Sequence, residues 1–138
     1  MVKVLATGVF NILHPGHLLF LEEAKKLGDE LDVIVSSDAI ASKLKEGFLL
    51  PQAQRAKMVG ALKPVDKVFV GDAYDPMKLI PVIQPDVIAL GHDQDVEEEW
   101  LEGQLAAIGS RAKIVRIEQK LEGGLSSSTE ILRRLNKP

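Results

Sequence analysis

Two histidines stand three residues apart in the segment His14-Pro15-Gly16-His17, which follows an apolar run ending at Gly8. An imidazole donates a directed hydrogen bond and changes charge near neutral pH, so a pair of them can hold a phosphate group during a reaction. Gly8 and Gly16 let the backbone come close to a ligand, and a helix beginning at Gly16 would add N–H groups and a positive dipole end. We predict a phosphate site at this turn, with His14 and His17 as its catalytic groups.

Two other interpretations of this histidine pair stay open on the residues alone. Each ring could serve only the structure, or the pair could be half of a metal site. The chain has no cysteine and one further histidine, His92, so nothing nearby completes a metal centre and we expect none in the protein. The lack of cysteine also excludes disulfides and a cysteine nucleophile.

Two more candidate positions follow a later strand or begin a helix. Asp93 comes just after an apolar run closed by Gly91, where it could contact a ligand or cap the next helix. Ser126, Ser127 and Ser128 precede the last apolar helical pattern. Their hydroxyls could cap that helix, bind a phosphate group at its start, or do both.

Five short apolar runs are the elements that would position these groups. They are rich in Val and Ile and mostly continuous, as in strands buried on both faces of a parallel sheet, and cover residues 2–7, 31–36, 67–70, 86–90 and 113–117. Helical patterns lie between and after them, over residues 16–27, 51–64, 76–83, 96–108 and from 126 onward. The alternation predicts an α/β fold: a single Rossmann-like, doubly wound domain over residues 1–138, with a five-stranded parallel sheet flanked by helices. In such a sheet, ligands bind at the carboxyl ends of the strands near the switch in strand order.

The composition narrows the class of protein. The 138 residues are 46% hydrophobic and 27% charged, with a net charge of -3, an ordinary globular balance that suggests neither nucleic acid nor a membrane as partner. No run approaches the ~20 apolar residues of a membrane helix. The apolar start is short and contains Lys3, unlike a signal peptide, so we expect a cytoplasmic location.

Residues 7–17, Thr-Gly-Val-Phe-Asn-Ile-Leu-His-Pro-Gly-His, resemble the signature T-G-T-F-D-x-L-H-x-G-H. This signature belongs to the cytidylyltransferase-like branch of the H-x-G-H nucleotidyltransferase superfamily. Residues 24–31 resemble the first helix and second strand of the branch, and Gln54-Arg55 its Q-R-x-x-x-V element. Within the branch, residues 62–67 and 84–94 are most similar to the archaeal FAD synthases. Glycerol-phosphate cytidylyltransferases carry G-D-D-W where this chain has Gly91-His92-Asp93-Gln94.

The resemblance implies attack of a phosphate oxygen on the α-phosphorus of a nucleoside triphosphate, with release of pyrophosphate. It implies ATP as nucleotide, FMN as the small phosphorylated acceptor, a divalent cation (Mg²⁺ is our expectation) carried with the nucleotide, and a homodimer. It assigns the nucleotide to Thr7, Gly8, Val9, Phe10, His14, Pro15, Gly16, His17, Gly91, Asp93, Ser126, Ser127 and Ser128. It assigns the acceptor phosphate to Asn11, Lys43, Lys45 and Arg55, of which Arg55 is favoured by its planar fork, whereas surface lysines are commonly just solvated.

Several departures from the family pattern keep other functions open. Asn11 replaces the usual Asp, and the basic loop of the branch is reduced to Lys43-Leu44-Lys45-Glu46-Gly47. The paired C-terminal cysteines of archaeal FAD synthases are absent, and the arginine of the R-T-x-G-I-S-T-T signature has no clear match before Glu122. The alternatives are a CTP-dependent cytidylyltransferase acting on glycerol 3-phosphate or a similar phosphoalcohol, and a non-catalytic nucleotide-binding module. Only 4% of residues are aromatic, so few rings are available to stack on a flavin.

Overall fold

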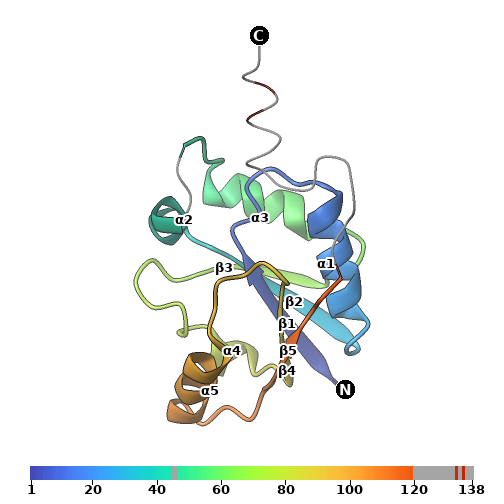
Figure 1. Cartoon of the computed structure of the whole chain (residues 1–138), viewed down its shortest axis with the longest axis vertical. Helices are drawn as coiled ribbons and strands as arrows, with labels where there is room; N and C mark the ends of the chain where they lie inside the picture. The colour runs from blue at the N-terminus through green and yellow to red at the C-terminus, as the bar shows by residue number, and fades with distance from the viewer. Residues whose placement is uncertain (45–46, 120–132, 134, 136–138) are drawn as a thin grey trace.

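A parallel sheet of five strands forms the centre of the computed structural model, which describes residues 1–44, 47–119, 133 and 135. The strands are β1 (Lys3–Gly8), β2 (Glu30–Val35), β3 (Lys67–Val70), β4 (Val87–Leu90) and β5 (Lys113–Arg116). Their order across the sheet is β3-β2-β1-β4-β5, with every neighbouring pair parallel (Figure 1). The chain builds outward from β1 to β3 and then returns to place β4 on the other side of β1. The switch point therefore lies between the carboxyl ends of β1 and β4.

The continuous apolar runs explain why these segments are strands. Val4, Leu5 and Ala6 in β1 are all fully buried, which is possible only where helices cover both faces of the sheet. The predicted five-stranded α/β fold is confirmed. The expected strand limits are correct to within one or two residues, the usual uncertainty at strand ends.

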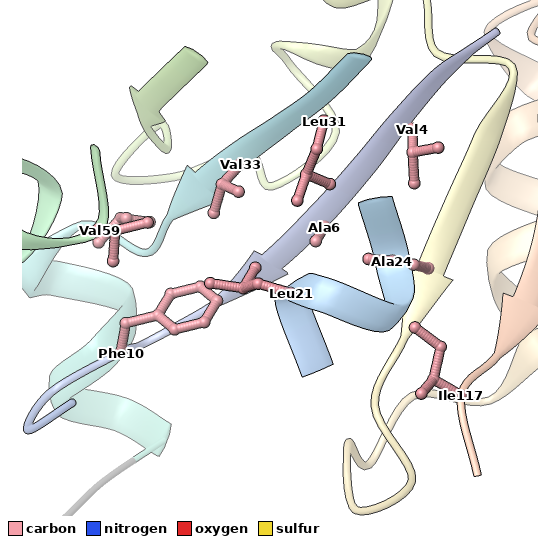
Figure 2. Close-up of a cluster of buried hydrophobic side chains, with 11 residues drawn as sticks. Val4, Ala6, Phe10, Leu21, Ala24, Leu31, Val33, Val59 and Ile117 are labelled. Atoms are coloured by element: carbon pink, nitrogen blue, oxygen red, sulfur yellow. The ribbon is translucent and has the colours of Figure 1, made fainter. Parts of the chain in front are cut away.

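Helices cover the two faces of the sheet. On one face α1 (Pro15–Lys25) and α3 (Gln52–Gly60) pack on a buried cluster that includes Val4, Ala6, Leu21, Ala24, Val33 and Val59, most of it drawn in Figure 2. On the other face lie α4 (Ile80–Ile83) and α5 (Glu98–Ala107). They contribute Ile83 and Leu105 to a second buried cluster, together with Leu5, Ile34, Ile88 and Leu90 of the strands. Successive side chains of one strand point to opposite faces, so β1, β2, β3 and β4 each contribute to both clusters.

The short helix α2 (Asp38–Leu44) was not expected from the sequence. It buries only Ala41, so it has almost no apolar periodicity to detect. Its start is marked instead by Ser37, whose Oγ accepts a hydrogen bond from the backbone N–H of Ile40 at 3.2 Å. The helix predicted to begin at Ser126 lies outside the described residues. Among the described helices, none has the length and apolar character needed to span a membrane.

Candidate active site

The His14-Pro15-Gly16-His17 turn stands directly beyond β1, at the switch point of the sheet. His14 is the N-cap residue of α1, in an extended conformation, and Pro15 is the first helical residue. Proline fits this position because the first N–H of a helix has no partner within the helix. The local sequence therefore fixes where the helix begins and which side chains gather at its N-terminus.

The two histidines cap the helix reciprocally. The Nδ1 atom of His14 accepts a hydrogen bond from the N–H of Gly16 at 3.1 Å, and the Nδ1 atom of His17 accepts one from the N–H of His14 at 3.3 Å. The rings are stacked, with centroids 3.8 Å apart and planes inclined by 25°. A nitrogen that accepts a hydrogen bond carries no proton, so each neutral ring carries its proton on Nε2. In this tautomer Nε2–H is the hydrogen-bond donor of each side chain.

Phe10 and Gly8 shape the loop that leads into this turn. Phe10 has a left-handed backbone (φ 51°), and its ring is 4% exposed within the cluster of Figure 2. A Cβ atom on Gly8 would lie 2.8 Å from Cε2 of that ring. Gly8 is therefore required by the packing of Phe10 itself. A left-handed aromatic residue is strained by about 1–3 kcal/mol, and such strain concentrates at functional loops.

Gln94 joins the two sides of the switch point. Its Oε1 accepts a hydrogen bond from the N–H of Gly91 at 2.7 Å, and its Nε2 donates to the carbonyl of Thr7 at 3.0 Å. Asp93 is exposed within the same turn. The N-cap of α5 is Glu97, so the structure gives Asp93 no part in capping that helix. Sequence reasoning did not single out Gln94, although its place just after β4 was a usable signal.

Arg116, also missed from the sequence, fixes the remainder of this turn. Its Nη1 donates to the carbonyls of Gly91 and Gln94, and its Nη2 to that of Val96, all at 2.8 Å. Its Nε donates to Glu98 at 3.2 Å. A shallow cavity of about 380 Å³ beside it is lined by Val96, Glu97, Glu98, Glu99 and Arg116. Three carboxylates make that cavity unfavourable for a triphosphate.

Arg55 has a position that differs from the sequence-based expectation. Its side chain is fully buried, and its guanidinium donates to three backbone carbonyls and one carboxylate. The acceptors are Leu50 O (2.7 Å), Val9 O (2.9 Å), Ser36 O (2.8 Å) and Asp38 Oδ1 (2.8 Å). A guanidinium so enclosed and so used by the protein does not reach an acceptor phosphate in this structure.

Asn11 is also buried and engaged at both ends of its amide. Its Nδ2 donates to the carbonyl of Phe48 at 2.7 Å, and its Oδ1 accepts from the N–H of Leu50 at 2.8 Å. An Asp carboxylate at this position would place an oxygen against the carbonyl of Phe48, so the amide suits this contact. Lys43 is exposed on α2, and Lys45, Ser126, Ser127 and Ser128 lie outside the described residues.

A parallel sheet of order 3-2-1-4-5, with an H-x-G-H turn and its imidazole donors at the switch point, is the framework of a Rossmann-like nucleotidyltransferase. A family model described as cytidylyltransferase-like matches residues 5–134, and the chain belongs to this family. The resemblance seen in the sequence is thus confirmed, and the chain is a nucleotidyltransferase.

Curated relatives give a narrower comparison. The chain is 50% identical to the FAD synthase of Archaeoglobus profundus, over 98% of this chain and 86% of that protein. It is 51% identical to the FAD synthase of Ferroglobus placidus, over 98% of this chain and 88% of that protein.

Among solved structures, the lipopolysaccharide core biosynthesis protein of Thermoplasma volcanium is similar, with TM-score 0.84 and 41% identity. That match covers 88% of this chain and 99% of the other. Pantoate-beta-alanine ligase of Francisella tularensis, at 18% identity and TM-score 0.61, covers 99% of this chain and 65% of the other and shares the fold.

Proposed function

We propose that this chain transfers AMP from ATP to FMN, forming FAD and releasing pyrophosphate. The observation that carries the proposal is the identity of about half of all residues, over nearly the whole chain, to proteins named FAD synthase. The position of the H-x-G-H turn at the switch point of the sheet supports the same reaction class.

In this reaction an oxygen of the FMN phosphate forms a bond to the α-phosphorus of ATP. The bond from that phosphorus to the α–β bridging oxygen breaks, and pyrophosphate leaves with the electron pair. The attacking phosphate is already ionised, so no general base is needed. The site must hold the two phosphates in line and stabilise charge on the α-phosphate.

His14 and His17 are suited to that task. With both Nδ1 atoms accepting backbone hydrogen bonds, each ring is oriented as an Nε2–H donor at the positive end of α1. We propose that these donors contact the phosphates of ATP, lined by Thr7, Gly8, Val9, Phe10, Pro15 and Gly16. Gly91 and Asp93 would face the nucleoside, and Ser126, Ser127 and Ser128 the β- or γ-phosphate, with Lys43 and Lys45 toward the acceptor.

The cation would arrive as part of the substrate. Within residues 1–44 and 47–119 no three histidine, aspartate or glutamate side chains gather into a metal site. We propose that Mg²⁺ bound to the triphosphate supplies charge neutralisation. We also propose the homodimer implied by the family resemblance, which sedimentation of the purified protein would test.

The reaction can be tested with two substrate mixtures. Pyrophosphate release and the flavin product are followed with Mg²⁺, ATP and FMN, and in parallel with Mg²⁺, CTP and glycerol 3-phosphate. We expect release, and FAD, only in the first mixture. Release only in the second would identify a cytidylyltransferase, and release in neither would contradict the proposal.

Variants of His17 separate its donor function from its capping function. In His17→Asn the Oδ1 atom can still accept from the N–H of His14, but the donor at the Nε2 position is lost. In His17→Gln the amide nitrogen can replace Nε2 while the cap is lost. We expect His17→Asn to lower kcat by about 10²–10³-fold, the usual loss for one donor to a developing charge, and His17→Gln to retain more activity. Near-full turnover of His17→Asn would refute the assignment.

A further inference from the structure

Phe48 has an exposed side chain on a backbone segment that is held by hydrogen bonds. Its side chain is 58% exposed, although it is one of only four phenylalanines in the chain. Its backbone is nevertheless held at its own carbonyl and at Leu50, two residues further on, by the buried amide of Asn11. An exposed apolar ring on an anchored backbone keeps its place when a ligand arrives, so it loses little conformational freedom on binding.

The anchor connects Phe48 directly to the catalytic loop. Asn11 lies three residues before His14, between β1 and α1. Its amide is 6% exposed and its two hydrogen bonds fix the segment 48–50 against the loop that carries the histidines. The two hydrogen bonds therefore hold the backbone of Phe48 next to the loop that leads to the histidines.

Arg55 holds the same backbone segment as Asn11, because it also binds Leu50. One fully buried guanidinium donates to the carbonyls of Leu50 and Val9, so the same side chain holds both the segment bound by Asn11 and the loop just before Asn11. It also binds Ser36 and Asp38, which join the end of β2 and the start of α2 to the same point. Four hydrogen bonds from one planar group are beyond what a lysine can supply.

We propose that Phe48 is the acceptor-contacting residue of the site, packing its ring against the isoalloxazine of FMN, and that Asn11 and Arg55 are the positioning residues that hold it there. The proposal rests on the proposed function for the identity of the acceptor. A flat, largely apolar ring system is the ligand chemistry that a fixed phenyl group favours, through area burial and stacking. A phosphoalcohol such as glycerol 3-phosphate offers no such surface.

The direct test compares Phe48→Ala with Phe48→Trp and with Tyr74→Ala. Tyr74 is the matched control, because it is an aromatic residue, 92% exposed, on the loop between β3 and α4. We expect Phe48→Ala to raise the KM for FMN about tenfold, equivalent to about 1.4 kcal/mol, with the KM for ATP and the melting temperature nearly unchanged. Phe48→Trp should restore the KM for FMN, and Tyr74→Ala should leave it as it is.

The positioning residues need a readout that a general loss of stability would not give. In Asn11→Ala the donor to the carbonyl of Phe48 and the acceptor for the N–H of Leu50 are both lost, and in Arg55→Lys the bond to Leu50 is lost or weakened. For the folded protein we expect the KM for FMN to rise by a larger factor than the KM for ATP, and hydrogen exchange to become faster only at the N–H of Leu50 and its neighbours. Exchange that rises uniformly over the sheet, with both KM values altered alike, would assign these residues to stability alone.

A binding measurement keeps this inference distinct from the proposed reaction. FMN fluorescence is titrated with protein in the absence of ATP. Quenching by the parent protein that is lost in Phe48→Ala supports the contact even if no FAD is formed. Formation of FAD with the same KM for FMN in the parent and in Phe48→Ala would overturn the contact while leaving the reaction intact. No FMN binding to the parent protein would overturn both.

Discussion

Asp32 gives the chain a stability that depends on pH in a direction opposite to that of most carboxylates. It lies in the middle of β2 with 1% of its surface exposed, and its Oδ1 has no hydrogen-bond donor among the described residues. Glu30 lies two residues earlier on the same face. Burial, reinforced by the Glu30 carboxyl group, raises the pKa of Asp32 from 3.8 to about 6, against the smaller opposing charges of Lys3 and Lys67.

The sign follows from proton binding. Between pH 4 and pH 6 the folded protein keeps a proton on this pair that the unfolded chain has already released. The free energy of unfolding therefore falls as the pH rises through this window, and the loss is complete above pH 6. The difference between a pKa of about 6 and one of 3.8 corresponds to about 3 kcal/mol, an upper value because Asp32 and Glu30 titrate together.

The variant Asp32→Asn removes the ionisation and keeps the shape of the side chain. We expect it to match the parent at pH 4, where Asp32 is protonated, and to be more stable by about 1–3 kcal/mol at pH 7.5. Urea unfolding followed by circular dichroism at pH 4, 5, 6 and 7.5 measures the difference, in which the other carboxylates cancel. Glu102→Gln, an exposed change on α5, serves as the control. A difference between Asp32→Asn and parent that stays constant from pH 4 to pH 7.5 would refute the reasoning.

Three further changes test the packing around the site. Gly8→Ala should lower the free energy of unfolding by about 1–3 kcal/mol in urea, because its Cβ would stand 2.8 Å from the buried ring of Phe10, and an unchanged midpoint would contradict this. Gln94→Ala should cost about 1–3 kcal/mol and raise the KM for ATP, because the N–H of Gly91 and the carbonyl of Thr7 lose their partner. Gly103→Ala should raise the free energy of unfolding in urea by about 0.5–1 kcal/mol, because the position lies in the middle of α5 and nothing lies within 4 Å of the added Cβ.

The fold could be predicted from the sequence because its signals are local. Each strand is a continuous apolar run, and each long helix has its own apolar face, so the alternation alone indicates a parallel sheet. The same holds for the catalytic turn, whose Pro15 and His14 set the start of α1 within a few residues. The helix α2 was missed because a seven-residue helix that buries only Ala41 leaves no such pattern.

The supporting hydrogen bonds could not be predicted, because their partners are distant in the sequence. Gln94 binds the carbonyl of Thr7, 87 residues away, and Arg55 that of Val9, 46 residues away. The planar guanidinium group of Arg55, within a family motif, predicts a phosphate ligand. The sequence does not indicate which backbone carbonyls lack a hydrogen-bond donor. Only the fold shows that Arg55 is enclosed by its own loops.

Arg55 and Arg116 both donate hydrogen bonds to backbone carbonyls of the loops, on opposite sides of the switch point. Where the strands end, their loops leave carbonyl groups without sheet partners, and an unpaired buried carbonyl costs about 1–3 kcal/mol. Arg55 donates to three loop carbonyls, those of Val9, Ser36 and Leu50. Arg116 donates to three after β4, of which those of Gly91 and Gln94 also accept a backbone N–H. Each guanidinium is also paired with a carboxylate, Arg55 with Asp38 and Arg116 with Glu98, so its main contribution is to hold the loops in place rather than to add net positive charge. A lysine at either position could supply the positive charge but not the planar set of hydrogen-bond donors. In Arg55→Lys we therefore expect the geometry of the loops to be lost although the charge is kept.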